Sequence, residues 1–170
     1  QVTGSHNPRD DNGFKMVMRH DSFFGEDIAT LARLAEAGDW ERGSGSIECV
    51  DLLADYVDRL LAGYSGGAYR IAWDAGNGAA GPVVAALTQR LPGEHHLLYC
   101  DVDGTFPHHH PDPSVEANLA DLKAVVAREG LDIGIAFDGD GDRIGLVDAR
   151  GRVLWGDDIL ALLVPAMLAE

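Results

Sequence analysis

Three aspartates alternate with two glycines and are followed by an arginine in the stretch Asp138-Gly139-Asp140-Gly141-Asp142-Arg143. Carboxylates at every second position of a flexible turn can converge on one point, and a set of oxygen ligands suits a hard divalent cation such as Mg²⁺. The glycines allow positive φ and hence a tight bend. We therefore predict that Asp138, Asp140 and Asp142 bind Mg²⁺. Arg143 cannot be a ligand, and its fixed positive charge suits a phosphate held beside the metal.

Two simpler interpretations of this stretch are an acidic surface turn and an EF-hand loop. An EF-hand that began at Asp138 would need Gly at its sixth position and Glu at its twelfth, between two helices. Those positions hold Arg143 and Ala149, and the flanking runs read as strands. A solvated turn would mix Asn, Ser and Pro with its Asp and Gly. The sequence therefore favours a functional divalent-metal loop.

The composition limits the partners and the compartment. The 170 residues suffice for one ordinary domain, or for one domain and part of a second. With 13 basic and 28 acidic residues the net charge is −15, which argues against nucleic acid or an anionic membrane as a partner. Cys49 and Cys100 match no CxxC spacing, so we expect reduced thiols in a cytoplasmic protein. No apolar run reaches transmembrane length. Because Gln1 replaces an initiator Met, we expect a piece of a longer protein.

Residues 1–13 contain almost no apolar side chains and are predicted to form a loop with Ser5, His6 and Asn7 at its centre. By itself this loop favours a solvated turn in which the polar side chains bind their own backbone. A lone serine in such a loop can also serve as a nucleophile or a phosphate carrier. Lys15 follows at the start of a short predicted strand, where an exposed charge is common.

The hydrophobic pattern predicts an α/β fold: a mainly parallel sheet of strand–helix–strand units with a C-terminal hairpin, preceded by part of a second α/β domain. Ser114 is the expected N-cap of one helix. In the first part we predict a strand at 14–18 and helices at 25–37 and 47–62. The second part should contain strands at 69–73, 96–100 and 131–137, helices at 79–91, 114–129 and 157–170, and a hairpin of 144–147 with 152–155.

Two further motifs have alternative explanations. The stretch Gly76–Gly81 matches the GxGxxG dinucleotide fingerprint, with Asp101 as an acidic residue 20 positions later. We favour a tight strand-to-helix turn in which the glycines serve geometry only, but a dinucleotide-binding module stays open. The run His108–His110 could bind a transition metal. Adjacent histidines on an extended chain point in opposite directions, so a rigid loop bounded by prolines is the preferred interpretation.

Two long motifs occur in a fixed order, namely Thr3-Gly4-Ser5-His6-Asn7-Pro8 with Asn12-Gly13-Phe14-Lys15, and then Asp138–Arg143. With Asp74–Gly78 and Asp103–Pro107, they make the chain similar to the α-D-phosphohexomutase family, which contains phosphoglucomutase/phosphomannomutase and phosphoglucosamine mutase. The resemblance covers nearly the whole chain. It implies a protein of four domains, of which this chain would hold the end of domain 1 with a phosphoserine loop (1–46), a connecting helix (47–63), domain 2 with the metal loop (64–155) and the start of domain 3 (156–170).

The resemblance also implies a mechanism. Phosphorylated Ser5 would donate its phosphoryl group to a hexose phosphate and recover another from the bisphosphate formed, which moves phosphate between C1 and C6. Ser5 would share the Mg²⁺ with the three aspartates, Arg143 would hold phosphate oxygens, and Lys15 would act as general acid/base. His6 and Asn7 would orient the loop and contact phosphate or substrate. A sugar 1,6-bisphosphate would act as activator.

The resemblance places the loops that grip the sugar in other domains, so we expect the chain alone to be inactive and its sugar to stay undefined among glucose, mannose and glucosamine. The stretches Thr3–Ser5 and Asp103–Pro107 favour the glucose/mannose subgroup over the glucosamine subgroup. Another Mg²⁺-dependent phosphoryl enzyme, a phosphatase with an Asp nucleophile, is the alternative within the same chemistry. The dinucleotide-binding module is the alternative outside it.

Overall fold

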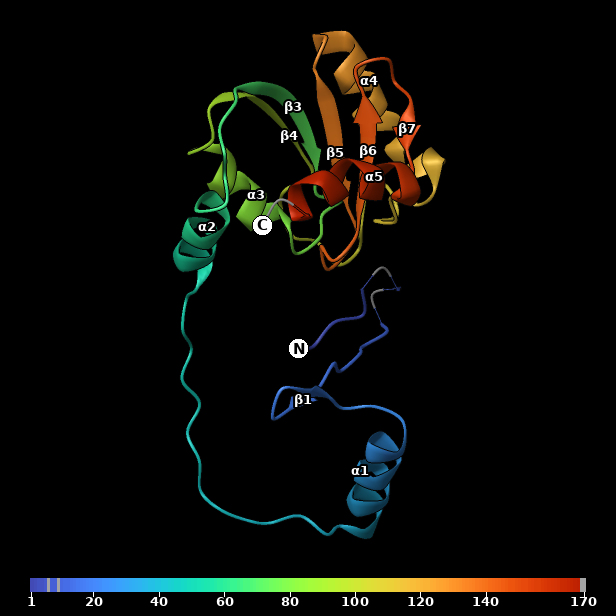
Figure 1. The fold of residues 1–170 in the computed structure, drawn as a ribbon. Helices are drawn as coiled ribbons and strands as arrows, with labels where there is room; N and C mark the ends of the chain where they lie inside the picture. Colours follow the sequence, from blue (N-terminus) through green and yellow to red (C-terminus); the bar gives the residue numbers. More distant parts are fainter. Residues whose placement is uncertain (6, 9, 169–170) are drawn as a thin grey trace. The chain divides into compact units, whose positions relative to one another are not determined.

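The computed structural model describes residues 1–5, 7–8 and 10–168, coloured along the chain in Figure 1. The chain divides into two compact units. The first contains Gln1–Thr3 and Asn12–Asp51, and the second contains Gly4–Asp11 and Leu52–Glu170. The serine loop and the acidic loop therefore belong to the same unit, whereas Lys15 belongs to the other.

The first unit is small and open. Strands β1 (Val17–Met18) and β2 (Asp21–Ser22) form an antiparallel pair, and helix α1 (Glu26–Ala37) ends at Gly38 in the left-handed conformation. The strand predicted at 14–18 is thus only two residues long. A strand needs a partner along its length, and β2 offers only two residues, while Phe14 makes an isolated bridge to Val2.

The second unit is built on a five-stranded sheet in the order β4-β3-β5-β6-β7. β3 pairs in parallel with β4 and β5, and β6 pairs antiparallel with β5 and β7. The α/β class and the hairpin are confirmed, with a parallel half and an antiparallel half that meet at β5. The strand bounds are Tyr69–Asp74 for β3, Gly93–Leu98 for β4, Ile133–Phe137 for β5, Ile144–Asp148 for β6 and Val153–Leu154 for β7.

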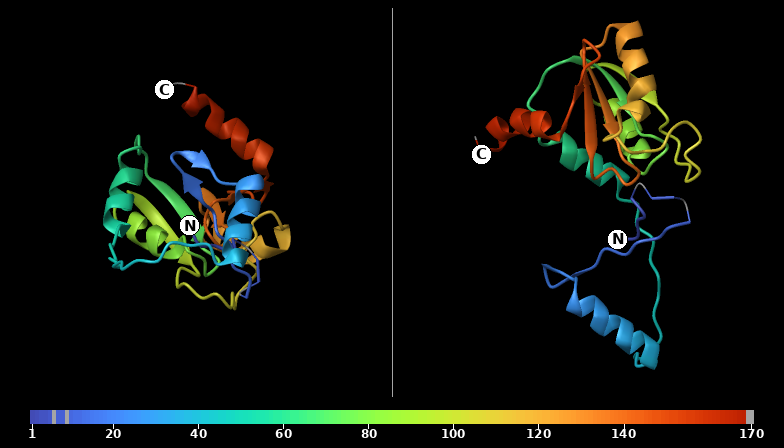
Figure 2. Two further views of the ribbon diagram at one scale, coloured as in Figure 1. Left: turned by 90° about the horizontal axis from the view of Figure 1, so that it is seen from below. Right: turned by 90° about the vertical axis from the view of Figure 1, so that its right-hand side faces the viewer.

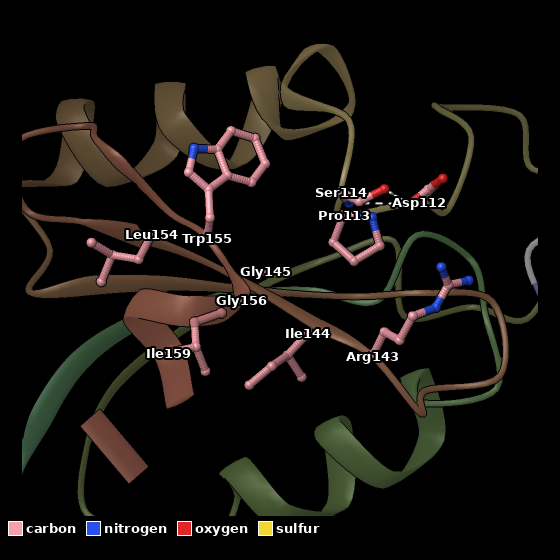
Figure 3. A pocket seen from close by; sticks show the side chains of 10 residues that line it. All are labelled: Asp112, Pro113, Ser114, Arg143, Ile144, Gly145, Leu154, Trp155, Gly156 and Ile159. Atoms are coloured by element: carbon pink, nitrogen blue, oxygen red, sulfur yellow. Dashed lines mark hydrogen bonds between the residues drawn. The ribbon is translucent and has the colours of Figure 1, made fainter. Parts of the chain in front are cut away.

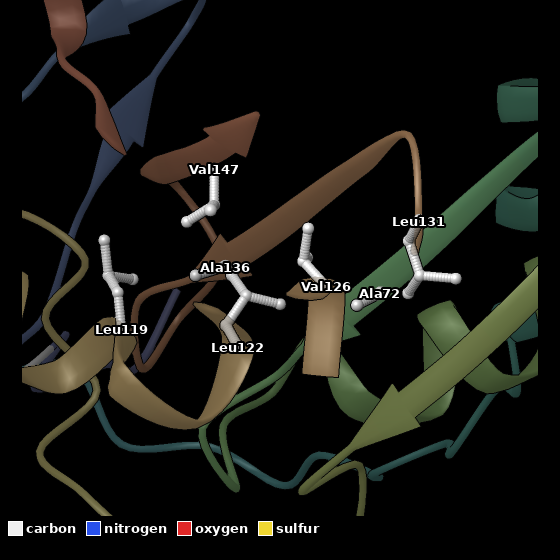
Figure 4. Close-up of a cluster of buried hydrophobic side chains, with 7 residues drawn as sticks. All are labelled: Ala72, Leu119, Leu122, Val126, Leu131, Ala136 and Val147. Carbon is white, nitrogen blue, oxygen red and sulfur yellow. The ribbon is translucent and has the colours of Figure 1, made fainter. Parts of the chain in front are cut away.

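Helices cover both faces of this sheet, as Figures 1 and 2 show. Small and branched side chains of alternate strand residues face α4, and together they form the core in Figure 4: Ala72, Leu119, Leu122, Val126, Leu131, Ala136 and Val147. The rings of Trp73 and Phe137 stack on the opposite face, toward α2 and α3. The helices are α2 (Leu53–Leu61), α3 (Gly81–Thr88), the 3₁₀ turn η1 (Glu116–Leu119), α4 (Ala120–Glu129) and α5 (Gly156–Met167).

Several predicted boundaries are wrong. The helix expected at 47–62 begins at Leu53, because Ile47 is 95% exposed and has no packing surface that would repay helix formation. The helix expected at 114–129 begins as η1 at Glu116. Ser114 is not its N-cap: its hydroxyl donates to the Asp112 carboxylate at 2.6 Å in the preceding turn.

Within the described part of the chain, no helix is both long enough and apolar enough to cross a membrane.

Candidate active site

The acidic loop is the connection of an antiparallel hairpin. Phe137, the last residue of β5, pairs with Ile144, the first residue of β6, so residues 138–143 form a loop closed at its base. Two backbone hydrogen bonds brace it from inside: the Asp138 N–H donates to the Arg143 carbonyl at 3.2 Å, and the Gly141 N–H donates to the Asp138 carbonyl at 3.1 Å. The loop lies at the carboxyl end of a parallel strand, where ligands of α/β sheets bind.

The three carboxylates converge as predicted. Asp138, Asp140 and Asp142 each offer an oxygen, and these oxygens all lie within 4.8 Å of one another. Asp138 is fully buried, Asp140 is partly buried and Asp142 is exposed, so the cluster opens toward solvent. An all-oxygen set of this kind fits Mg²⁺ and would suit a soft metal poorly.

The two glycines of the loop serve different purposes. Gly141 has φ +75°, as the tight turn requires. Gly139 does not adopt positive φ, which corrects the expectation that both glycines serve the bend. A side chain on Gly139 would instead overlap the carbonyl oxygen of Ser5, so this glycine allows the serine loop to approach.

Arg143 binds the buried aspartate of the same loop. Its Nε and Nη2 donate to Asp138 Oδ2 at 3.1 and 2.9 Å, and its backbone N–H donates to Oδ1 at 3.1 Å. Arg143 Nη2 also lies 3.4 Å from Ser5 Oγ. The guanidinium therefore offsets the charge of a buried carboxylate and lies beside the serine hydroxyl.

Ser5 meets the acidic loop across 133 residues of sequence. Its Oγ lies 3.1 Å from Asp138 Oδ2 and 3.3 Å from Asp140 Oδ1, as a hydroxyl that can donate to either. The residue has φ 53°, a left-handed conformation that is uncommon for residues other than glycine and often marks functional sites. The fold thus brings together four of the predicted site residues: Ser5, Asp138, Asp140 and Arg143, with Asp142 at the open side.

Three further residues were predicted for the site, namely His6, Asn7 and Lys15. Asn7 is exposed in the serine turn, where its N–H donates to the Gly4 carbonyl at 3.0 Å. Lys15 is exposed in the first unit, with its N–H donating to the Gln1 carbonyl at 2.9 Å. His6 lies outside the described residues. The roles proposed for these three stay predictions.

The glycine turn at 76–81 is filled by the protein itself. A methyl group on Gly78 would lie 2.7 Å from the Gly139 carbonyl oxygen, and one on Gly81 would overlap the Cys100 carbonyl. The Ala79 N–H donates to the Gly139 carbonyl at 2.9 Å. In a dinucleotide fingerprint these amides and glycines would face a pyrophosphate. Here Gly78 and the Ala79 N–H face the acidic loop and Gly81 faces the Cys100 backbone, which supports the interpretation as a structural turn.

A pair of hydrogen-bonded side chains, Asp74 and His109, lies beside this turn, and the sequence did not predict it. Asp74, at the end of β3, is fully buried and contacts His109 Nε2 through both carboxylate oxygens, at 3.1 and 3.0 Å. The hydrogen bond with Asp74 raises the pKa of His109. The neighbouring His108 Nδ1 lies 2.7 Å from Asn77 Oδ1. Instead of forming a metal site, two of the three adjacent histidines bind separate polar partners.

A cavity of about 320 Å³ borders the loop on the side of β6 and α5, shown in Figure 3. Arg143 stands at one end of it, and Leu154, Trp155 and Ile159 supply apolar surface at the other. Pro113 and Ser114 close it from the segment before η1. The loop arginine therefore faces both the carboxylates and a space beside them.

The second unit thus combines a mixed α/β sheet with an acidic hairpin loop and a serine beside that loop. The family model described as "Phosphoglucomutase/phosphomannomutase, alpha/beta/alpha domain II" matches residues 54–151, more than half of the chain. The chain belongs to the phosphoglucomutase/phosphomannomutase family.

Individual relatives carry names of the same family. A phosphomannomutase/phosphoglucomutase of Pseudomonas aeruginosa is 43% identical over 170 residues, which cover 99% of this chain and 37% of the relative. A phosphoglucomutase of Neisseria meningitidis is 40% identical, with 98% and 37% covered. A crystal structure of a phosphoglucomutase/phosphomannomutase family protein from Burkholderia thailandensis matches with a TM-score of 0.92 and 42% identity, over 99% of this chain and 37% of that one. The chain thus spans little more than a third of these relatives.

Proposed function

We propose that the enzyme containing this chain is a phosphohexomutase, which moves phosphate reversibly between C1 and C6 of a hexose phosphate. The observation that carries the proposal is the placement of Ser5 Oγ at 3.1 and 3.3 Å from two carboxylates of a loop 133 and 135 residues away. Family membership supplies the reaction class. The phosphatase alternative gives Ser5 no role and so leaves this contact without a purpose.

In the proposed reaction Ser5 carries a phosphoryl group on Oγ. A sugar hydroxyl attacks phosphorus, the bond to Oγ breaks, and the proton of the hydroxyl passes to Lys15 as general base. The resulting sugar bisphosphate turns round, and Ser5 Oγ takes its other phosphoryl group while Lys15 returns a proton to the leaving sugar oxygen. The number of phosphates is conserved, and the net change is an isomerisation.

The residues present fit a bound Mg²⁺. Asp138, Asp140 and Asp142 would hold it, together with a phosphate oxygen on Ser5. When bound, the cation supplies neutralisation of charge on the transferring phosphoryl group. Arg143 lies 3.4 Å from Ser5 Oγ, close enough to donate hydrogen bonds to that group. We assign His6 and Asn7 to orienting the serine loop and contacting phosphate or substrate.

We infer that the chain alone does not turn over substrate, because it spans about 37% of its relatives and lacks the sugar-gripping loops expected elsewhere. The two thiols, Cys49 and Cys100, are free, in keeping with a cytoplasmic enzyme. The proposed partner is a hexose phosphate, with neither nucleic acid nor membrane, and a sugar 1,6-bisphosphate is the proposed activator.

The test is an assay of the full-length enzyme on glucose 1-phosphate, mannose 1-phosphate and glucosamine 1-phosphate, with Mg²⁺ and a trace of sugar bisphosphate. Ser5→Ala should lower turnover by roughly 10⁴-fold or more, as removal of a nucleophile does in other enzymes, and should leave the melting temperature unchanged. Ser46→Ala, at an exposed serine of the linker, is the matched control. Phosphate release without isomerisation would favour the phosphatase. Isomerisation that survives Ser5→Ala would remove the serine from the mechanism.

A further inference from the structure

Asp74 and His109 form a buried pair that neither binds the proposed metal nor touches Ser5. His109 is 14% exposed and Asp74 is fully buried. His109 Nε2 faces the carboxylate, and its Nδ1 lies 3.0 Å from the His110 carbonyl oxygen. Both partners are acceptors only, so the ring satisfies both contacts when each nitrogen carries a proton. The geometry points to an imidazolium ion bound to a carboxylate.

Two further contacts hold the pair in place. Asp74 Oδ1 also accepts the Gly76 N–H at 2.9 Å. The Tyr99 ring meets the His109 ring edge-on, with 5.5 Å between the ring centroids, and stacks on the His108 ring, with 3.9 Å between the centroids. A buried ion pair contributes little net stability, although breaking it costs a great deal. A role in fixing the backbone is therefore a better explanation for this pair than stability alone.

The backbone segment that contains His109 also contains Pro111, which lies near the acidic loop. His109 is two residues before Pro111, whose side chain is fully buried. A methyl group on Gly139 would lie 3.5 Å from Pro111 Cγ, and one on Gly76 would lie 3.1 Å from Pro111 Cβ. Pro111 thus packs between the strand-to-helix turn and the acidic loop. The backbone of Ser5 packs against the same glycine, Gly139.

We propose that Asp74 and His109 are positioning residues for the acidic loop: their ion pair fixes the segment around Pro111, and Pro111 supports Gly139. The loop is then held from two directions, because the Ala79 N–H binds the Gly139 carbonyl at 2.9 Å. When Gly139 is held in this position, Ser5 Oγ stays 3.1 Å from Asp138 Oδ2. The inference rests on the proposed metal site and names residues that hold it without touching the metal.

The first experiment titrates the full-length enzyme with Mn²⁺ alone, without substrate, and measures free Mn²⁺ by electron paramagnetic resonance. His109→Ala should weaken Mn²⁺ binding by about 10- to 100-fold, as losses of supporting partners do at other metal sites. His109→Gln keeps a neutral N–H donor for Asp74 and should retain most of the affinity. His110→Ala, at the exposed neighbour, should change nothing. Equal affinities for wild type and His109→Ala would overturn the proposal.

A second variant tests the route and serves if His109→Ala does not fold. Pro111→Ala leaves the Asp74–His109 pair intact and removes ring atoms that face Gly139, so this variant by itself should weaken Mn²⁺ binding. Where His109→Ala folds, the double variant should bind little more weakly than His109→Ala, because both changes act on the same route. Amide exchange of Ala79, measured without metal, should accelerate in Pro111→Ala because its acceptor is no longer held. Unchanged affinity and exchange in this variant would contradict the route. The wild-type enzyme is titrated first. If it fails to bind Mn²⁺, the proposed metal site itself is wrong.

Discussion

Two aspartates of the acidic loop, Asp138 and Asp142, differ in burial and in their hydrogen bonds. Asp138 is fully buried and accepts three hydrogen bonds from Arg143, two from the guanidinium and one from the backbone. The Asp142 side chain is 53% exposed and lies 3.7 Å from Arg143 Nε. Asp138 is thus both a structural anchor and a candidate ligand, whereas Asp142 is a candidate ligand on the exposed side of the loop.

We predict that the two positions separate stability from metal binding. Asp138→Asn leaves Arg143 without its carboxylate and should lower the free energy of unfolding by about 1–3 kcal/mol. Asp142→Asn should change it by no more than about 0.5 kcal/mol, as is usual for exposed positions. Both should abolish stabilisation by Mg²⁺, which adds RT ln(1 + [Mg²⁺]/Kd) to wild type. Urea unfolding with EDTA and with Mg²⁺ measures both effects. Equal losses in EDTA would contradict the distinction.

For individual residues, the sequence predicts those site features that depend on neighbouring positions in the chain. The convergence of Asp138, Asp140 and Asp142 follows from their alternation in a turn, and Ser5 follows from a motif resemblance. The Asp74–His109 pair could not be predicted, because its members are 35 residues apart and only the sheet and the Pro111 segment bring them together. Spacing likewise suggested a turn at Gly139, whereas its reason is the approach of another segment.

Among the elements, the order of strands and helices was predictable but several ends were not. Helix α1 and strand β3 begin and end within a residue of their predicted bounds, because apolar periodicity and a glycine stop mark them. Helix α2 begins six residues later than predicted, at Leu53 instead of Ile47. The periodic pattern continues through Ile47 and Val50, but both are exposed, and only tertiary packing decides where such a helix starts.

The packing of α4 on β5 gives an element-scale prediction. A methyl group on Gly134 of β5 would lie 2.8–2.9 Å from atoms of Leu122 and Val126 in α4. Gly134→Ala should therefore overpack the core and lower the free energy of unfolding by about 1–3 kcal/mol. Gly104→Ala is the matched control, because nothing lies within 4 Å of that position. Denaturant unfolding of both variants provides the measurement, and a neutral Gly134→Ala would show that the helix can shift without cost.

The His109 segment predicts a pH dependence. Charged groups face this ring from each neighbouring element: Asp74 from β3 and Asp121 from α4, whose carboxylate accepts the Tyr99 hydroxyl at 2.7 Å. Since the pKa of His109 in the folded state is raised above its ordinary 6.5, its protonation stabilises the fold fully below pH 6.5. That contribution disappears as the pH rises through the folded pKa. Wild type should therefore exceed His109→Gln in unfolding free energy more at about pH 6 than at about pH 9. A constant difference would argue against a charged ring.

For the molecule as a whole, the two units differ in how well they can be stabilised alone. In the first unit no described residue is buried, and Ile28, Leu31 and Leu34 of α1 are 44%, 43% and 41% exposed. The second unit has a continuous core between the sheet and α4. The first therefore lacks the buried apolar surface that offsets the entropy of folding.

We predict that hydrogen exchange in the isolated 170-residue chain divides along the same line. Amides of residues 14–18 and of α1 should exchange rapidly, because few tertiary contacts oppose local opening. Amides of β3 and β5, with a partner on each side, should exchange most slowly. Exchange followed by mass spectrometry or NMR gives the comparison. Protection at 14–18 comparable to that in β3 would show that the first unit has a core of its own.

Because the acidic loop is closed at its base, the spacing of its carboxylates and the position of Ser5 are set by different parts of the structure. The Phe137–Ile144 pair and two backbone bonds set the ligand spacing within one short hairpin, which could be transplanted to another antiparallel sheet as a unit. The serine arrives on a different piece of chain, across 133 residues. A change in the global structure can therefore connect or disconnect Ser5, the proposed phosphate carrier, while the three carboxylates keep their own arrangement.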